Sequence, residues 1–341
     1  MPTSSQPTEI TTKSDSRPVQ WSRLLRSFGT LIGFLVIVAF FSWQKPNTFL
    51  NVRNWLNITQ QVSILGVVAF TMTVVMVLND FDLSVGTMAS LVGIVLGVLL
   101  RDGQSSLPAA IGAALIVGMV GGLLNGILVS YVGISPFVAT LGTLTMFNGL
   151  ALYISGGTTI FGRVIPTELS DFGRGGIPLG TVAEQQVVLP NLTIVALIVL
   201  VIVWIMLEQT VFGRRLYAIG GNMEAARLGG VRVRLLRLLA FVISGLGAAI
   251  AGLMLVSRLA SANPTQGDGL MLNAIAAVFL GMTMSEEGEP HVLGTLLGVL
   301  ILGVLANGLT QLQIDTYIQQ ILTGGIIILA VTLSSLSRRS S

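Results

Sequence analysis

Ten apolar stretches alternate with shorter polar segments along the chain. They lie at residues 27–43, 62–79, 84–101, 108–130, 136–155, 190–207, 238–257, 270–284, 291–308 and 317–336. A helix of about 20 apolar residues crosses the hydrocarbon layer of a bilayer, and most of the stretches approach that length. A few are short enough to be broken or re-entrant. The pattern predicts an all-α polytopic membrane protein with about ten transmembrane helices.

The positions of arginine and lysine predict which side of the membrane each loop occupies. Ten crossings put both termini on one side. Basic residues gather before the first stretch, within 213–237 and after the last stretch, and all three regions fall on that side. Cytoplasmic loops carry the excess of Lys and Arg, so this side is predicted to be cytoplasmic. The 158–189 loop, which mixes both signs of charge, then lies outside.

These features divide the chain into a polar cytoplasmic tail at 1–26 and a single transmembrane domain at 27–341. The first apolar stretch lacks a clear small-x-small cleavage site, so we expect the tail to be retained rather than removed with a signal peptide. Within the domain, halves at about 27–157 and 190–336 flank the outer loop. Residues 208–237 form a cytoplasmic loop.

The two halves share a spaced set of small and polar residues. A glycine and asparagine pattern in GAALIVGMVGGLLNG recurs 182 residues later in GTLLGVLILGVLANG. The matched positions are Gly112, Gly121, Asn125 and Gly126, and Gly294, Gly303, Asn307 and Gly308. Five spans separate the copies, so the predicted architecture is two inverted five-helix repeats, a frequent arrangement in transporters. Chance similarity is the competing interpretation, because glycine is common in membrane helices.

Composition narrows the possible chemistry. Only 10% of the residues are charged and the mean hydropathy is +0.85, whereas soluble domains are about 25% charged. The absence of cysteine excludes disulfides and thiolate chemistry, and the lone His291 argues against a histidine-based metal site or triad. The chain has no GxxxxGK[ST] motif, and its only lysines are Lys13 and Lys45. A membrane enzyme is therefore disfavoured, and so is a nucleic-acid partner, because the net charge of +3 comes mainly from arginines in loops and tails.

One charged segment interrupts the apolar pattern. Residues 213–237 read GRRLYAIGGNMEAARLGGVRVRLLR and hold six arginines and one glutamate. NMEAARL, between two Gly-Gly pairs, predicts a short helix capped by Asn222, with Glu224 in its first turn and Arg227 near its end. Orientation in the membrane requires the arginines but not a capped helix. Such an element suits docking in a groove of a cytoplasmic protein.

Four stretches, in order, carry a resemblance to a known family. They are FDLSVGTMASLVG at 81–93, PFVATLGTLTMFNGLALYISGG at 136–157, GRRLYAIGGNMEAARLGGVRV at 213–233 and SANPTQGDGLMLNAIAAVFLG at 261–281. They resemble segments of the ribose-type (monosaccharide) permeases, membrane subunits of ATP-binding-cassette (ABC) importers in the branched-chain amino acid/ribose permease superfamily. The resemblance covers roughly residues 55–335.

The resemblance implies a multi-component importer of a monosaccharide or related polyol in the bacterial inner membrane. Two permease copies, identical or related, would pair above ABC ATPase subunits, and a periplasmic sugar-binding protein would dock outside. ATP-Mg would bind to the partner ATPase, and this chain would hold no cofactor. Residues 219–230 would form the coupling helix. The implied ATPase-contact residues are Gly220, Gly221, Asn222, Glu224, Ala225, Ala226, Arg227 and Leu228.

Polar residues within or beside the apolar stretches are candidates for the translocation path or its gate. They are Asp82, Ser84, Asn125, Thr143, Asn148 and Asn307. Asp80 and Asp82 lie between the second and third stretches, and we expect Asp82 to cap a helix beginning at Leu83-Ser84, with a gating role left open. The amide and hydroxyl groups have two interpretations: they bond a sugar hydroxyl in the path, or they bond across helices.

The chain departs from the resembling pattern at several positions. Asn79-Asp80-Phe81 stands where Gly-Gly-Ile is usual, Asn148 replaces a common Arg, and Met271 replaces a Glu. GMTMSEEGEPHVLGT at 281–295 replaces a Gly- and Ser-rich run. Its acidic residues, Glu286, Glu287 and Glu289, either meet basic residues of the ATPase or are solvated, and we favour the second interpretation.

An ion- or proton-coupled secondary transporter of a small polar solute is the alternative function. Inverted repeats fit it equally well. Such a transporter normally carries acids or bases deep within its spans, and the apolar stretches hold none away from their ends. Transport that survives loss of every partner ATPase would favour this alternative.

Overall fold

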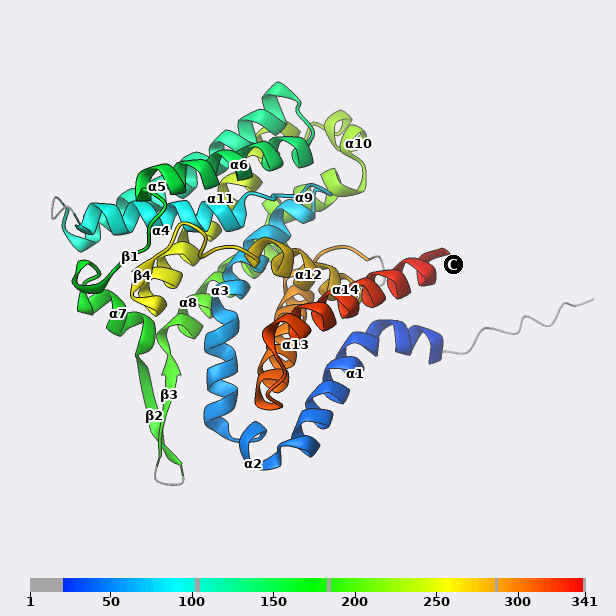
Figure 1. Ribbon diagram of the computed structural model, residues 1–341. Coiled ribbons are helices and arrows are strands. Elements are labelled where there is room, and N and C mark those ends of the chain that lie inside the picture. The colour runs from blue at the N-terminus through cyan, green and yellow to red at the C-terminus, as the bar shows by residue number, and fades with distance from the viewer. Residues whose placement is uncertain (1–20, 102–104, 183–184, 286–287, 340–341) are drawn as a thin grey trace, which may run out of the picture.

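A computed structural model describes residues 21–101, 105–182, 185–285 and 288–339 of the chain (Figure 1). Its helices are α1 (Trp21–Gln44), α2 (Pro46–Phe49), α3 (Val52–Met76), α4 (Val85–Arg101), α5 (Leu107–Ile127), α6 (Pro136–Ser155), α7 (Thr167–Arg174), α8 (Asn191–Trp204), α9 (Val211–Gly221), α10 (Met223–Leu228), α11 (Val233–Leu259), α12 (Leu270–Met282), α13 (Val292–Gln311) and α14 (Thr316–Arg339). Residues 1–20 of the predicted tail, with Lys13 and Arg17, lie outside the described residues, as do Glu286 and Glu287.

Short elements complete the architecture. The strands are β1 (Ile160–Phe161), β2 (Gly176–Val182), β3 (Gln185–Pro190) and β4 (Ser261–Ala262). Wider π-helical turns continue α5 at Leu128–Val132 and α8 at Ile205–Gln209, and a 3-10 turn covers Gly162–Val164.

Each of the ten predicted stretches overlaps a helix. Within the described ranges, six helices are long and apolar enough to cross a membrane: Val52–Met76, Leu107–Val132, Pro136–Ser155, Asn191–Gln209, Val233–Leu259 and Val292–Gln311. Three shorter apolar helices lie at Gly29–Gln44, Val85–Arg101 and Leu270–Met282. The mostly helical, multi-pass class is confirmed, while ten crossings in two inverted repeats stay a prediction.

Helix α3 begins ten residues earlier than the apolar pattern predicted. The side chain of Asn51 accepts a hydrogen bond from the Arg53 amide at 2.9 Å and caps the helix there. The first turns, at residues 52–61, carry six polar side chains and so lie outside the predicted apolar stretch. Their groups are satisfied locally, however, as where the Thr59 hydroxyl donates to the Leu56 carbonyl at 2.8 Å.

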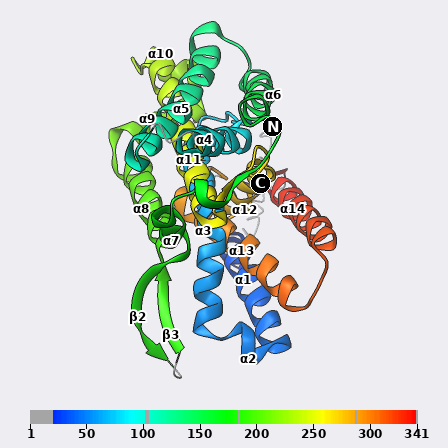
Figure 2. The same ribbon diagram turned by 60° about the vertical axis from the view of Figure 1, so that its left-hand side comes forward.

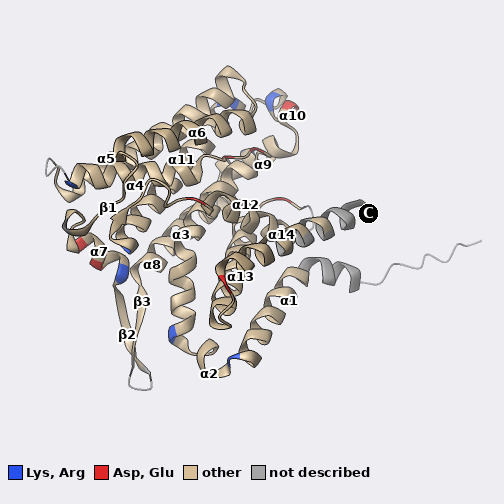
Figure 3. Ribbon diagram, in the orientation of Figure 1, with Lys and Arg blue, Asp and Glu red and all other residues tan. Residues whose placement is uncertain are grey.

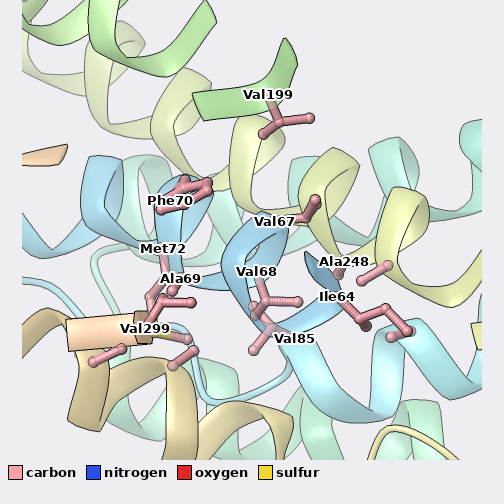
Figure 4. Packing of buried hydrophobic residues seen from close by; sticks show 14 of the residues in the cluster. Ile64, Val67, Val68, Ala69, Phe70, Met72, Val85, Val199, Ala248 and Val299 are labelled. Carbon is pink, nitrogen blue, oxygen red and sulfur yellow. The ribbon is translucent and has the colours of Figure 1, made fainter. Parts of the chain in front are cut away.

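The interior of the molecule is built around α3. This helix packs against α8, α11, α12 and α13, and Figure 4 shows its side chains, including Ile64 and Phe70, among Val85, Val199 and Val299 of neighbouring helices. In the most apolar 18 residues of α3, 72% of the positions are buried. In the corresponding parts of the α5 and α6 spans only 28% are buried. In a bilayer, α5 and α6 therefore present apolar surface to lipid or to another chain.

Helices α5 and α11 approach each other through glycine. Gly118, Gly122 and Gly126 recur every fourth residue along one face of α5. A Cβ atom on Gly122 would lie 2.4 Å from the Phe241 carbonyl oxygen, and one on Gly118 would lie 2.6 Å from the Gly245 carbonyl oxygen. Stripes of small residues let membrane helices meet at backbone distance, where dispersion contacts hold them together.

The chain extends outward in a hairpin that the sequence had suggested only as a loop of mixed charge. Strands β2 and β3 pair antiparallel, with a register shift between Pro178 and Gly180, and β1 pairs with β4 in a separate two-stranded sheet. Figures 1 and 2 place this hairpin and α10 at opposite ends of the molecule, and Figure 3 shows charges gathered at helix ends and loops. The arrangement agrees with the predicted opposite sides of 158–189 and 213–237.

Replacing Gly122 with Ala should destabilise the protein, because the added methyl group forces α5 away from α11. Overpacking of this kind costs about 1–3 kcal/mol. Gly112→Ala is the matched control, since a Cβ there meets nothing within 4 Å. Thermal unfolding of both variants in detergent measures the difference. Equal stability of the two would contradict the close approach.

The opposed ends of the molecule can be labelled separately because the chain contains no cysteine. Leu179 on β2 is 60% exposed and Leu228 on α10 is 79% exposed. A membrane-impermeant maleimide should label Leu179→Cys in cells whose outer barrier is permeable to it. It should label Leu228→Cys only after the cytoplasmic membrane is opened. The reverse pattern would overturn the predicted sidedness.

Candidate functional site

Helix α10 has the cap that the sequence predicted. The Asn222 side-chain oxygen accepts a hydrogen bond from the Ala225 amide at 2.9 Å, which satisfies one of the free amides of the first turn. Glu224 lies in that turn and Arg227 in the last, and their side chains form an ion pair of 2.6 Å. Both side chains are more than 60% exposed, so the pair contributes little to stability.

The predicted ATPase-contact residues form an outward-facing surface. Ala226 is buried and Gly220 is half-buried, and these two attach the segment to the rest of the chain. The others are exposed: Gly221, Asn222, Glu224, Ala225, Arg227 and Leu228. Leu228, a large apolar side chain, is 79% exposed. A rigid helix that presents an apolar tip between charges is suited to docking.

The segment that carries α10 is attached to the connection between α3 and α4. The Asn79 side-chain amide donates a hydrogen bond of 2.7 Å to the Gly220 carbonyl at the end of α9. A Cβ atom on Gly220 would lie 1.9 Å from the Val77 carbonyl oxygen, so only glycine permits this backbone contact. Asn79 has φ = 59°, in the left-handed region that Asn and Gly tolerate.

Asp80 and Arg237 form a two-pronged ion pair at the same place. Arg237 Nε lies 2.5 Å from Asp80 Oδ2, and a terminal guanidinium nitrogen lies 2.7 Å from Oδ1. The side chains are only 5% and 17% exposed, for Asp80 and Arg237 respectively. Forked Arg–carboxylate pairs of this kind fix orientation as well as supply energy.

Tyr217 fixes the other side of α9. Its hydroxyl donates to the Pro290 carbonyl at 3.0 Å. Burial, with the carboxylates of Glu208 and Glu289 nearby, raises the pKa of the Tyr217 phenol above its ordinary value, so it stays neutral. Glu208 also lines an open pocket of about 330 Å³ together with His291. In the described part of the chain, no group of three or more His, Cys, Asp or Glu residues is placed to hold a metal ion.

A buried hydrogen-bond network unites four of the six predicted path residues. Ser84 Oγ donates to Asp82 Oδ1 at 2.7 Å and accepts from the Asn125 amide at 2.8 Å. The Thr143 hydroxyl donates to Asn125 Oδ1 at 2.7 Å. Ser244 on α11 donates to the second Asp82 oxygen at 2.8 Å. The network therefore ties the α3–α4 connection to α5, α6 and α11.

The predicted cap at Asp82 is corrected by the structure. Helix α4 begins at Val85 rather than at Leu83-Ser84. Asp82 instead accepts a hydrogen bond from the amide of Ser84, two residues on, at 3.0 Å. The short Asp side chain closes a local turn before the helix starts, and its other oxygen is free to reach α11.

The remaining two predicted path residues lie outside this network. Asn148 is half-buried on α6. Asn307 is buried on α13, and its side-chain oxygen accepts a hydrogen bond from Gln311 of the same helix at 3.0 Å. For Asn125 and Thr143 the observed bonds run between helices, as one of the two interpretations stated. A contact of any of these residues with transported solute stays a prediction.

The sequence did not predict the contacts of three residues in this region, Asn79, Arg237 and Ser244. A signal for Arg237 existed, because a carboxylate such as Asp80 between two apolar stretches favours a polar or cationic partner. Arg237 is the last of the six arginines in its segment and immediately precedes an apolar run. Nothing in the sequence distinguishes Ser244 from other small polar residues of membrane helices.

The fold and this site define a multi-pass membrane protein whose polar groups join helices and whose charged helix is displayed at one end. Comparison with known proteins is more specific. Residues 54–331 match the family described as branched-chain amino acid transport system / permease component. The chain belongs to this family of transport permeases.

Several relatives match along most of their length. The ribose import permease protein RbsC of Bacillus subtilis (strain 168) is 37% identical over 324 residues, 94% of this chain and 96% of that protein. The D-allose transport system permease protein AlsC of Escherichia coli (strain K12) is 33% identical, over 95% and 96%. The xylose transport system permease protein XylH of the same strain is 32% identical, over 93% of each. No solved structure matches the chain.

Replacing Thr143 with Val should destabilise the protein, because Asn125 Oδ1 then loses its donor in a buried place. An unsatisfied buried polar group costs about 1–3 kcal/mol. Thr145→Val on the same helix is the control, because Thr145 is exposed and bonds only the Leu141 carbonyl of its own helix. Thermal unfolding compares the two. A Thr143 variant as stable as the control would show that the network contributes nothing to stability.

Proposed function

We propose that this chain is the membrane-spanning permease subunit of an ATP-driven importer and forms the path for a monosaccharide or a related polyol. The observation that carries the proposal is the match to permeases named for ribose, allose and xylose over 93–95% of this chain. A match of that extent includes the helices, the connections and the loop with α10. The particular sugar does not follow from it.

We assign the contact with the ATPase to α10. Its cap and glycine flanks make it a stable short helix, and its exposed Leu228 and the Glu224–Arg227 pair offer an apolar and a charged contact together. The sequence lacks a GxxxxGK[ST] motif, so the ATP-Mg that drives transport binds to a separate chain. Force applied to α10 by that chain would then move the membrane helices.

The remaining components follow from the same proposal. A second permease copy, identical or related, would complete the path, and the exposed apolar faces of α5 and α6 offer surface for lipid or for that copy. A sugar-binding protein would dock at the end with β2 and β3, on the periplasmic side of the inner membrane. Both termini would be cytoplasmic. The Asp82–Asn125 network would act as part of the path or its gate.

Proteoliposomes test the proposal directly. Vesicles that contain the full chain, with the ATPase and binding protein that co-purify from native membranes, should take up radiolabelled D-ribose, D-xylose or D-allose. Uptake should require ATP on the side of the membrane that carries the ATPase. Uptake by the purified chain without an ATPase would contradict the proposal and favour secondary transport.

Leu228→Asp should reduce the amount of co-purified ATPase at least tenfold, because a loss of about 1.4 kcal/mol at an interface lowers affinity by that factor. Leu228 is already exposed, so the stability of the chain itself should not change. Leu179→Asp is the matched control, because Leu179 is the same residue type and is 60% exposed at the opposite end of the molecule. Wild-type recovery of ATPase with the Leu228 variant would remove α10 as the contact.

A further inference from the structure

The chain before α10 and the chain after it, here called the two stems of the α10 segment (residues 211–237), are attached to one short piece of chain. This piece runs from Val77 to Asp80 and follows α3. The preceding stem is attached where Asn79 donates to the Gly220 carbonyl at 2.7 Å. The following stem is attached where Arg237 of α11 grips Asp80 through two nitrogens, at 2.5 and 2.7 Å. Helix α10 therefore lies in a loop whose two ends are fixed to the same turn.

The Asp80–Arg237 attachment is sheltered from water. With side chains only 5% and 17% exposed, water screens the charges and competes for the hydrogen bonds less than it does at an exposed pair. Removal of one partner would leave the other as an unpaired charge in a place from which water is largely excluded, which is strongly unfavourable. The exposed Glu224–Arg227 pair on α10 itself lacks this property.

The Gly220 attachment is short-range and stiff. The backbone of α9 touches the Val77 carbonyl so closely that no side chain fits at Gly220. Asn79 is held in a left-handed conformation, φ = 59°, that points its amide to the Gly220 carbonyl. A displacement of α9 therefore reaches the α3–α4 connection through direct backbone contact and does not depend on a flexible side chain alone.

The turn continues directly into the buried network. Two residues after Asp80, Asp82 bonds Ser84 and reaches Ser244 of α11 at 2.8 Å. Through Ser84 the network extends to Asn125 of α5 and then to Thr143 of α6. An unbroken series of short hydrogen bonds and covalent links therefore joins the stems of α10 to three membrane helices.

We propose that Asn79, Asp80 and Arg237 are positioning residues of transport: they clamp the α10 segment to the α3–α4 connection, so that movement of α10 changes the arrangement of α4, α5, α6 and α11. This inference rests on the proposed function. It assigns transmission of force to residues that lie outside the contact with the ATPase. Without the clamp, α10 still binds its partner, but its movement no longer reaches the membrane helices.

Uncoupling is the expected result when the clamp is broken. In proteoliposomes containing the full complex and radiolabelled D-ribose, or whichever of D-xylose and D-allose the wild type takes up, Asp80→Asn and Arg237→Lys should each raise the ATP hydrolysed per sugar transported about tenfold. Co-purified ATPase should stay at the wild-type level. Arg258→Lys is the matched control, because Arg258 is half-buried at the opposite end of the same helix; its ratio should not change.

Asn79→Gly provides a test that alters no charge. Glycine accepts φ = 59°, so the turn keeps its conformation and only the hydrogen bond to Gly220 is lost. We expect a smaller rise in the same ratio, about threefold. If the ATP hydrolysed per sugar transported is unchanged in the Asn79 and Asp80 variants, even where uptake and hydrolysis both fall, the clamp is overturned and the permease function stands. A wild-type chain with neither ATPase association nor ATP-dependent uptake would instead overturn the proposed function, and the clamp with it.

Discussion

A polar group buried among apolar helices must find its partner within the protein, and much of this structure follows from that requirement. Hydrocarbon offers no hydrogen bonds, so an unsatisfied group costs several kcal/mol there. Among the described residues, the buried side-chain nitrogen and oxygen atoms that lack a hydrogen-bond partner are only Ser130 Oγ and Gln266 Nε2. Some of these groups bond within their own helix, as the Thr73 hydroxyl does to the Ala69 carbonyl. Others reach a neighbouring element, as Ser244 does to Asp82 and Thr143 does to Asn125, and so they help to fix where the helices lie.

Helix α11 joins the two kinds of contact that hold the molecule together. Its middle meets α5 at backbone distance through Gly245, where dispersion acts between small residues. On the same helix Ser244 reaches Asp82, and its first turns supply Arg237 to Asp80. Helix α11 therefore carries both apolar packing and polar contacts. If the packing against α5 were lost, the bonds to Asp80 and Asp82 would still attach α11 to its neighbours, and the reverse also holds.

Features encoded locally could be predicted from the sequence, and features encoded by distant pairs could not. The apolar stretches gave the helices, and the spacing of Asn222, Glu224 and Arg227 gave α10 and its cap, because each depends on neighbours within a turn or two. The start of α3 was missed because its polar side chains are satisfied by nearby groups. Asp80 and Arg237 are 157 residues apart, so their pairing depends on how helices pack.

The hairpin at the far end of the molecule shows what kind of partner can meet it. An exposed strand edge normally invites another chain to add a strand. Here Pro178 has no amide hydrogen to donate, and the register shift before Gly180 bends the strand away from a regular ladder. These two features disfavour the addition of a strand along β2. They discourage edge-to-edge aggregation there for the same reason.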